Sequence, residues 1–384
     1  MKIQIDGTGT ENKGAELMLY SILEEIEHKM PTSRVTLNSF TTNLKYIKTN
    51  LKVRISLRQR LIYGPYIREI INRLKLPYHF FTDLFAEKNI DLVIDAGGFR
   101  YGDQWKYSDK YIELLEKYYR KLKENGTKII FLPQAFGPFN LPNSKKTVEI
   151  LNNYVDLIVA RDNVSKEFLL NENVDPKRIL VYPDFTFPTK GITPRKYSHL
   201  EDAVCIIPNR KMYSQTNISK LEYYELFEKV ITEIQNKGKH VFILNHEGIK
   251  DLKVCRNINN RLTKKVEIVN NLNAKEIKGV IGNSYLVISS RYHGVASALS
   301  QCVPCIATSW SHKYELLFGD FGIDSNIVDI NNEYDILISK IISLLDPNNN
   351  NQERDLLQSK HDELINSNSK MWKEIWEGID LSSN

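Results

Sequence analysis

Short apolar runs, each followed by a polar or glycine-bearing loop and then by a helical pattern, recur along almost the whole chain. In one example, Tyr285–Ile288 leads into Ser289-Ser290-Arg291, and small and apolar residues at helical spacing follow. Such runs indicate buried strands, and their alternation with helices is typical of an α/β protein with parallel sheets. The predicted strands are Ile3–Asp6, Val35–Asn38, Asp91–Asp95, Lys128–Leu132, Asp156–Ala160, Leu180–Tyr182, Val204–Ile207, His240–Leu244, Val266–Val269, Tyr285–Ile288 and Pro304–Ala307.

The alternation forms two series, which predicts two Rossmann-like domains facing a cleft. A length of 384 residues also exceeds the usual size of a single core. We expect a first domain over residues 1–190 and a second over 200–350, joined through 188–202, where proline, glycine and charge occur without periodicity. Residues 351–384 are predicted to form a C-terminal helix and tail, with the helix crossing back to the first domain.

The composition is that of a globular protein, with 42% hydrophobic and 26% charged residues. Four cysteines are too few for a disulfide scaffold, and Cys302 and Cys305 have no second pair at zinc-finger spacing, so we expect no metal site. No apolar run reaches the length of a bilayer span, and the chain begins directly with a strand pattern. These features predict a cytoplasmic protein.

Positive charge gathers between residues 45 and 75, where Glu69 is the only acidic residue and apolar residues are interleaved. Such a basic amphipathic segment can contact an anionic membrane at the inner face of the plasma membrane, or hold an anionic ligand. The alternative is a solvated helical face that packs its apolar side on the domain. The segment is short and has no RNA-binding aromatic motif, so we expect no nucleic-acid partner.

The segment from Ser290 to Gly294 combines groups suited to an anion and to proton transfer. The first N–H groups of a helix attract anions, because they lack partners and lie at the positive end of the helix dipole. Arg291 can bind a carboxylate or phosphate through two hydrogen bonds, and His293 can carry a proton. This predicts an anion-handling catalytic site, with an ordinary strand-to-helix corner as the alternative.

Other predicted strands also end in loops that can present polar groups. The first loop, Gly7–Gly14, has neither a Walker nor a dinucleotide-binding pattern. The pair Gly97-Gly98 allows close approach of a ligand or of another backbone segment. Tyr101-Gly102-Asp103-Gln104-Trp105 offers polar and aromatic groups suited to a sugar, and Arg161 follows its strand as Arg291 does.

In these segments the chain resembles the polysaccharide pyruvyl transferase family, from about Met1 to Ile330. The resemblance implies a GT-B-like architecture and transfer of the enolpyruvyl unit of phosphoenolpyruvate onto two sugar hydroxyls, which gives a pyruvate ketal. The matching motifs are Asn12-Lys13-Gly14, Asp95-Ala96-Gly97-Gly98, Pro133-Gln134-Ala135-Phe136-Gly137-Pro138, Val159-Ala160-Arg161-Asp162 and Ser289-Ser290-Arg291-Tyr292-His293-Gly294.

The resemblance also implies roles for individual residues. His293 and Arg291 are the expected catalytic residues, with His293 as the general acid. The first loop departs from the family pattern, because Ala15-Glu16 stands where an aspartate usually follows the glycine. The expected donor-binding residues are Arg161, Ser290, Arg291, His293 and Lys313, and the expected acceptor-binding residues are Asn12, Glu11, Glu16, Gly97, Gly98, Asp103 and Gln134.

On this interpretation phosphoenolpyruvate is the donor substrate, no cofactor is needed, and the acceptor is a saccharide or a lipid-linked oligosaccharide. Two other interpretations stay open. A glycosyltransferase that uses a nucleotide sugar would share the fold and the basic site, and a non-enzymatic binding protein of a polysaccharide assembly system would need neither activity. The sequence does not select the acceptor sugar, the regiochemistry of the ketal or the oligomeric state.

Overall fold

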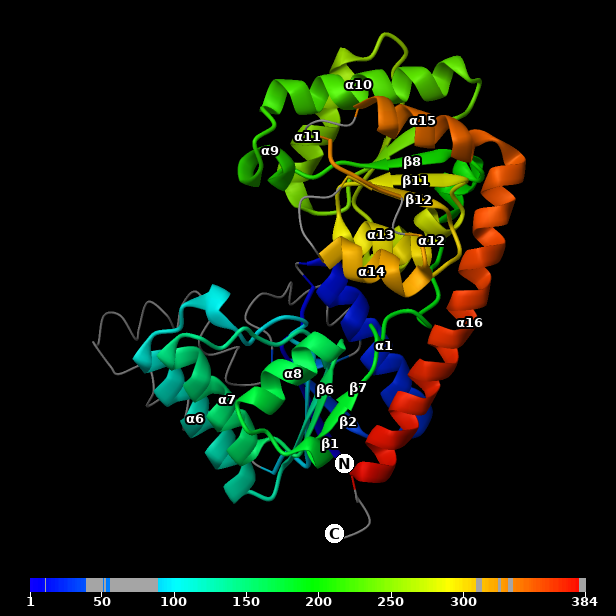
Figure 1. The fold of residues 1–384 in the computed structure, drawn as a ribbon. Helices are drawn as coiled ribbons and strands as arrows, with labels where there is room; N and C mark the ends of the chain where they lie inside the picture. Colours follow the sequence, from blue (N-terminus) through cyan, green and yellow to red (C-terminus); the bar gives the residue numbers. More distant parts are fainter. Residues whose placement is uncertain are drawn as a thin grey trace, which may run out of the picture. The chain divides into compact units, whose positions relative to one another are not determined.

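A computed structural model describes residues 1–10, 12–38, 51, 53–55, 89–308, 313–323, 326–330 and 334–379. Glu11 and most of the basic segment 45–75 lie outside these residues, so the expectations for them stay predictions. The chain divides into two compact units (Figure 1). The first comprises Met1–Thr186 together with the residues from Ser367 onward, and the second comprises Phe187–Asn366.

The first unit is built on a parallel sheet with the strand order β3-β2-β1-β4-β5-β6-β7. Its strands are β1 (Lys2–Asp6), β2 (Arg34–Asn38), β3 (Arg54–Ile55), β4 (Leu92–Asp95), β5 (Lys128–Gln134), β6 (Leu157–Ala160) and β7 (Ile179–Val181). Its helices are α1 (Lys13–Lys29), α6 (Asp109–Glu124), α7 (Pro142–Tyr154) and α8 (Asn163–Asn171), with 3-10 turns at Asp103–Trp105 and Pro176–Arg178.

Helices cover both faces of this sheet. On one face α1 packs with the end of α16 (Pro347–Gly378), and on the other α6, α7 and α8 pack (Figure 1). The end of α16 is fixed by side-chain hydrogen bonds: Asn368 Nδ2 donates to the carbonyl of Asp184 at 3.1 Å, and the Trp376 indole donates to Glu25 at 2.7 Å. The predicted return of the C-terminal helix to the first domain is therefore confirmed.

The second unit repeats this plan with the strand order β10-β9-β8-β11-β12-β13, again all parallel. Its strands are β8 (Val204–Ile207), β9 (Val241–Leu244), β10 (Glu267–Val269), β11 (Leu286–Ser289), β12 (Cys305–Thr308) and β13 (Ile327–Val328). Its helices are α9 (Lys211–Gln215), α10 (Lys220–Asn236), α11 (Gly248–Arg261), α12 (Ala274–Gly282), α13 (Tyr292–Leu299), α14 (Lys313–Phe321), α15 (Tyr334–Leu345) and the first part of α16, with a 3-10 turn at Arg195–Leu200.

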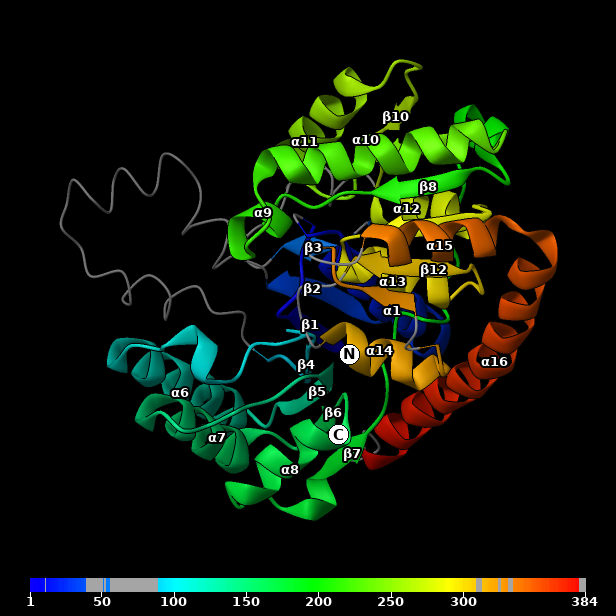
Figure 2. The same cartoon turned by 45° about the horizontal axis from the view of Figure 1, so that its top comes forward.

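This sheet also lies between two helical layers. Helices α10, α11 and α15 pack on one face, and α12, α13 and α14 pack on the other (Figure 1). Figure 2 shows α10 and α11 side by side. The strands carry apolar residues on both faces, which explains why they are recognisable in the sequence as continuous apolar runs. The predicted α/β fold with two Rossmann-like sheets is confirmed.

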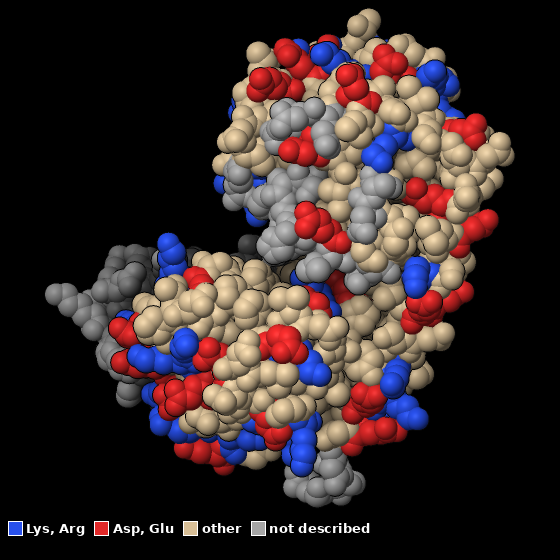
Figure 3. Space-filling model, viewed as in Figure 1, with Lys and Arg blue, Asp and Glu red and all other residues tan. Residues whose placement is uncertain are grey.

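The C-terminal helix, predicted within residues 351–384, begins earlier: α16 starts at Pro347 and includes Asn348–Asn351. Asp346 accepts hydrogen bonds from the backbone N–H groups of Asn348 at 2.9 Å and Asn349 at 3.3 Å, so it caps the helix start. Further along, Lys–Glu pairs follow at i,i+3 and i,i+4 spacing, and Figure 3 shows the two charge signs interspersed along this helix. No helix among the described residues combines the length and apolar character needed to cross a bilayer.

The segment 188–202, predicted as a linker, lies within the second unit and packs tightly on α12. Ile192 N–H donates to the carbonyl of Lys275 at 2.9 Å, and Lys278 Nζ donates to the carbonyl of Phe187 at 3.0 Å. A Cβ on Gly279 would lie 2.3 Å from the carbonyl carbon of Ile192, so the helix and the segment touch backbone to backbone.

We therefore expect Gly279→Ala to destabilise the protein by about 3 kcal/mol, because the new methyl group would push apart two backbone segments. The measurement is the midpoint of urea unfolding. Gly378→Ala is the matched control, since its Cβ would meet no heavy atom within 4 Å. Equal midpoints for the two variants would contradict the close backbone contact.

Candidate functional site

Each sheet has one place where the strand order reverses. In the first unit this place lies between β1 and β4, and in the second it lies between β8 and β11. The chain leaves the two strands toward opposite faces, as α1 and α6 do in the first unit. Ligands of open α/β sheets bind at the carboxyl ends of the strands at such a point. The residues at these two strand ends are therefore the first candidates for function.

In the first unit, Asp6 and Asp95 end β1 and β4 side by side, and both are buried. Arg100 forms an ion pair with Asp95, with 2.9 Å between Nη1 and Oδ2. The carboxylate of Asp6 accepts hydrogen bonds from the Tyr118 hydroxyl at 2.6 Å, Gln4 Nε2 at 2.9 Å and Asn38 Nδ2 at 3.0 Å.

This arrangement makes Asp6 a proton-binding group near neutral pH. Its pKa is raised from the ordinary 3.8 to about 6, mainly by burial and also by the negative charge of Asp95. The hydrogen bonds from Tyr118 and Asn38 and the charge of Arg100 lower the pKa but do not offset the burial. A buried carboxyl group with such a pKa at a strand end is a marker of a functional site.

Glycine is required where β1 and β4 end. Gly7 has φ +75°, and a Cβ there would lie 2.6 Å from the backbone nitrogen of Gly97 and 2.9 Å from Asp95 Oδ1. Gly97 in turn donates its N–H to Asp95 Oδ1 at 2.9 Å. The close approach predicted from Gly97-Gly98 is thus an approach of two backbone segments beside a buried carboxylate.

Two of the predicted acceptor-binding residues lie at the start of α1. Asn12 caps the helix, because its Oδ1 accepts from the backbone N–H groups of Gly14 at 2.9 Å and Ala15 at 3.2 Å. Glu16 is fully buried and pairs through Oε2 with Lys13 at 2.6 Å. Its second oxygen, Oε1, has no hydrogen-bond partner among the described residues.

Gln134 ends β5 and is fully buried. Its Nε2 lies 3.4 Å from Asp95 Oδ1, while its Oε1 finds no hydrogen-bond partner within the described part of the chain. Gly98 lies nearby, since its carbonyl accepts from the N–H of Ala135 at 2.9 Å. Arg161 adjoins the same strand, because its N–H donates to the carbonyl of Gln134 at 3.0 Å.

Asp103 has a different environment from the other predicted acceptor-binding residues. Its carboxylate accepts from the N–H groups of Asn140 at 2.9 Å and Leu141 at 3.0 Å and from the Ser144 hydroxyl. These contacts order the start of α7. Its contacts with the start of α7 are therefore enough to explain why an aspartate is present at this position.

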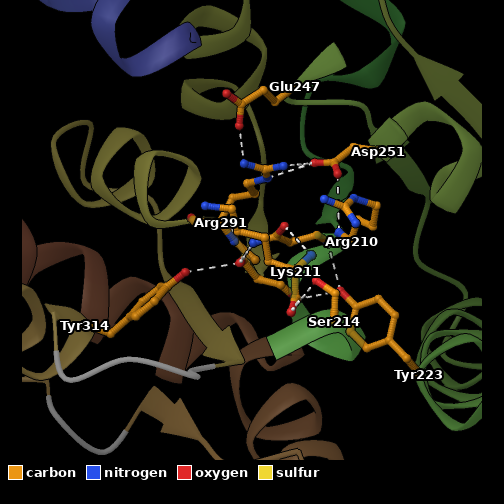
Figure 4. Close-up of polar contacts among 11 residues, drawn as sticks. Arg210, Lys211, Ser214, Tyr223, Glu247, Asp251, Arg291 and Tyr314 are labelled. Atoms are coloured by element: carbon orange, nitrogen blue, oxygen red, sulfur yellow. Dashed lines mark hydrogen bonds and ion pairs between the residues drawn. The ribbon is translucent and has the colours of Figure 1, made fainter. Parts of the chain in front are cut away.

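In the second unit, Arg291 is the N-cap residue of α13 and is held by two carboxylates of α11 and its N-cap (Figure 4). Its Nε donates to Asp251 Oδ2 at 2.8 Å, and its Nη2 contacts the same oxygen. Its Nη1 contacts Glu247 Oε2. Asp251 also accepts from the backbone N–H of Arg210 at 3.3 Å, which ties in the segment after β8.

Ser290 lies at the centre of a buried hydrogen-bond network rather than at the surface. Its hydroxyl lies 2.8 Å from the Tyr223 hydroxyl and 2.5 Å from Thr308 Oγ1. Its carbonyl accepts from Asn209 Nδ2 at 2.9 Å and from the Tyr314 hydroxyl at 3.1 Å. The network joins the ends of β8, β11 and β12 and so fixes the backbone from which Arg291 and His293 project.

The remaining predicted donor-binding residues share this end of the sheet. His293 lies in the first turn of α13, half-buried, with its ring 5.5 Å from that of Tyr292. Lys313 begins α14, and Tyr314 anchors that helix start to Ser290. Gly294 has no room for a side chain, because a Cβ would lie 2.6 Å from Ser289 Oγ.

Sequence reasoning missed Asp6, Arg100, Arg210, Glu247 and Asp251. A signal existed for Arg210 and Lys211, which follow the predicted strand Val204–Ile207 much as Arg291 follows its strand. Asp251 gave no such signal, since it lies inside a helix and meets Arg291 only through the fold. The described residues contain no group of three or more His, Cys, Asp or Glu side chains placed to hold a metal ion.

Comparison with family models gives one result. The model of the family named polysaccharide pyruvyl transferase matches residues 12–312, which is most of the chain. The match includes both strands of the second reversal, β8 and β11, and the segment Ser290–His293, whereas in the first unit it begins at Asn12, after β1. None of the curated proteins compared with the chain matches it.

Solved structures show the same architecture at low sequence identity. A candidate UDP-N-acetylglucosamine 2-epimerase from Listeria monocytogenes matches with a TM-score of 0.63 and 15% identity, over 99% of this chain and 96% of that one. UDP-GlcNAc 2-epimerase from Methanocaldococcus jannaschii matches at 0.59 and 15%, over 90% and 93%. Anabaena HepE in complex with UDP and glucose matches at 0.57 and 12%, over 100% of both chains. These similarities establish the GT-B-like fold.

The raised pKa of Asp6 leads to a prediction about stability. Because the pKa is higher in the folded protein than in the unfolded chain, ionisation of Asp6 lowers stability as the pH rises from about 4 to about 6. Asp6→Asn removes this cost and keeps an oxygen for Gln4 and Asn38. We expect the variant to gain up to about 3 kcal/mol over the wild type at pH 8 and nothing below pH 4.

The measurement is urea unfolding of both proteins at pH 8 and at about pH 4, with the difference between them taken at each pH. Asp109→Asn is the control in the same unit, since that side chain is 79% exposed. A gain that is equal at both pH values would show that charge on Asp6 is not its source.

Proposed function

This chain belongs to the polysaccharide pyruvyl transferase family, and on that premise we propose that it moves the enolpyruvyl unit of phosphoenolpyruvate onto a sugar. The acceptor is a cell-surface polysaccharide or its precursor, including a lipid-linked oligosaccharide, and the product is a pyruvate ketal. The observation that carries the proposal is the position of Arg291 and His293 at the strand-order reversal of the second unit, within the matched region.

Phosphoenolpyruvate carries a carboxylate and a phosphate, so its site needs several cations. Arg291 alone does not suffice, because two carboxylates already contact it. Arg210 and Lys211 follow β8 on the other side of the same reversal and add two positive charges (Figure 4). Arginine suits a bidentate contact with a planar carboxylate, while lysine acts as a point charge toward phosphate.

The chemistry requires an acid before it requires a base. The enol phosphate becomes electrophilic when its methylene carbon takes a proton, and His293 in imidazolium form is the proposed donor. Positive charge then develops at the adjacent carbon, and a sugar hydroxyl attacks there, losing its own proton. The C–O bond to phosphate then breaks, and a second hydroxyl attacks the same carbon and loses its proton, which closes the ketal. The two hydroxyl protons replace the proton that His293 gave and protonate the released phosphate. Cations near the phosphate stabilise its departure.

Hydrogen-bond acceptors in the first unit support an acceptor site for a polyhydroxy compound there. The Oε1 atoms of Gln134 and Glu16 are buried and lack hydrogen-bond partners among the described residues, and sugar hydroxyls are donors that would satisfy them. Asp6 has a pKa suited to accepting a hydroxyl proton near neutrality. We propose Asn12, Gly97 and Gly98 as the backbone frame of this site.

The test is phosphate release from phosphoenolpyruvate in the presence of a panel of sugar acceptors. We expect acceptor-dependent release by the wild type and a loss of about 10²- to 10⁴-fold in His293→Ala, because general acid catalysis contributes a factor of this size. His199→Ala is the matched control, since that histidine is exposed and pairs with Glu267 at 2.7 Å on the surface.

The outcomes separate the candidate functions. Full activity of His293→Ala would exclude this residue as the acid. Binding of UDP without binding of phosphoenolpyruvate would favour a glycosyltransferase that uses a nucleotide sugar. A ligand that binds the native state stabilises it. If neither phosphoenolpyruvate nor UDP raises the melting temperature, a non-enzymatic role is favoured.

A further inference from the structure

The charged groups that surround Arg291 do not favour the binding of an anion as they stand. One guanidinium group contacts two carboxylates, so the three side chains together carry one net negative charge. Such a group would repel an incoming anion. Yet Arg291 lies at the strand-order reversal, where an anionic ligand is expected.

The two carboxylates differ in how they hold the arginine (Figure 4). Asp251 is buried, with 2% of its side chain exposed, and contacts both Nε and Nη2 through one oxygen. Its other oxygen accepts from the backbone N–H of Arg210. Asp251 therefore fixes the inner edge of the guanidinium group and is tied to the surrounding backbone.

Glu247 contacts only the outer nitrogen, Nη1, and 25% of its side chain is exposed. It is the N-cap residue of α11, but its side chain makes no capping hydrogen bond to the first turn of that helix. Moving this side chain would thus break its contact with Arg291 without uncapping α11. Of the two carboxylates that contact the arginine, Glu247 is therefore the more accessible.

We propose that Glu247 is an exchangeable counterion whose carboxylate is replaced on Arg291 Nη1 by the carboxylate or phosphate of the donor. Asp251 is the positioning residue that keeps the guanidinium group oriented during the exchange. This inference rests on the proposed donor, phosphoenolpyruvate. It means that the Glu247 carboxylate competes with the donor for Arg291.

The physical consequence is a set of opposite effects for the two acids. Glu247→Gln keeps the size of the side chain but removes a negative charge that opposes the anion. The variant should bind phosphoenolpyruvate about tenfold more tightly, because the competing charge contact with Arg291 is lost. Asp251→Asn should weaken binding by at least about tenfold, because the inner edge of the arginine loses its charged partner.

The experiment is calorimetric titration of the full chain with phosphoenolpyruvate and, separately, with inorganic phosphate. Salt is varied, because screening should shrink the gain of Glu247→Gln. The control is Glu228→Gln, which removes a carboxylate from Arg261 at 2.6 Å on α10 and α11, away from the reversal. Its affinity should equal that of the wild type, and its melting temperature gives the effect of breaking an Arg–Glu pair in the same unit.

The results distinguish this inference from the proposed function. If the wild type binds phosphoenolpyruvate and Glu247→Gln binds it equally or less well, the exchange is wrong while the donor stands. If Glu247→Gln gains affinity for phosphate alone and no protein binds phosphoenolpyruvate, the exchange stands and the donor is wrong. If none of the proteins binds either anion, both proposals fall. If Asp251→Asn has a lower melting temperature, its weaker binding could reflect unfolding, and the result for Glu247→Gln then decides. Glu247 is partly exposed, so its substitution perturbs the fold less.

Discussion

The reversal of strand order in a parallel sheet is the constraint on which the rest of this structure depends. Successive parallel strands need crossover connections, and the connections on either side of the reversal run to opposite faces of the sheet. The carboxyl ends of the two central strands are therefore left beside each other, as Asp6 and Asp95 are in the first unit. In the second unit the same constraint brings the segment after β8 beside Ser290 and Arg291. Both candidate sites follow from this one feature of the chain's connectivity.

The two units use the same geometry for different charges. The first places two buried carboxylates at its reversal, with Arg100 beside one of them. The second places a hydroxyl network behind Arg291 and two basic residues on the adjoining strand end. The first environment suits hydroxyl groups that donate hydrogen bonds and release protons, whereas the second suits an anion once Glu247 is displaced from Arg291, as we propose. The two proposed substrates, a sugar and phosphoenolpyruvate, differ in the same way.

The sequence was sufficient for the fold because its information is local. Strands buried on both faces appear as continuous apolar runs, and the loops after them contain the residues at the sheet edge. The segment Ser290–His293 could be singled out because its groups are contiguous. Short or polar elements could not be predicted: β13 has two residues, and the polar run Asn348–Asn351 lies in the first turn of a helix that Asp346 caps. Residues that meet only in the folded chain could not be predicted either, since Asp251 lies 40 positions before the arginine that it contacts.

The buried charges can be ranked by what offsets their burial. Asp251 has a guanidinium partner through two nitrogens, so its charge is compensated, although such a pair is weak evidence for added stability. Asp6 has neutral hydrogen-bond donors and a carboxylate neighbour, the charge of Arg100 offsets its burial only in part, and its raised pKa records the uncompensated part. A neutral side chain at Asp6 would serve the core better, and natural proteins keep such costs mainly where ligands bind. Asp6 is therefore the stronger sign of function in the first unit, stronger than Asp103, whose contacts are explained by the helix start that it orders.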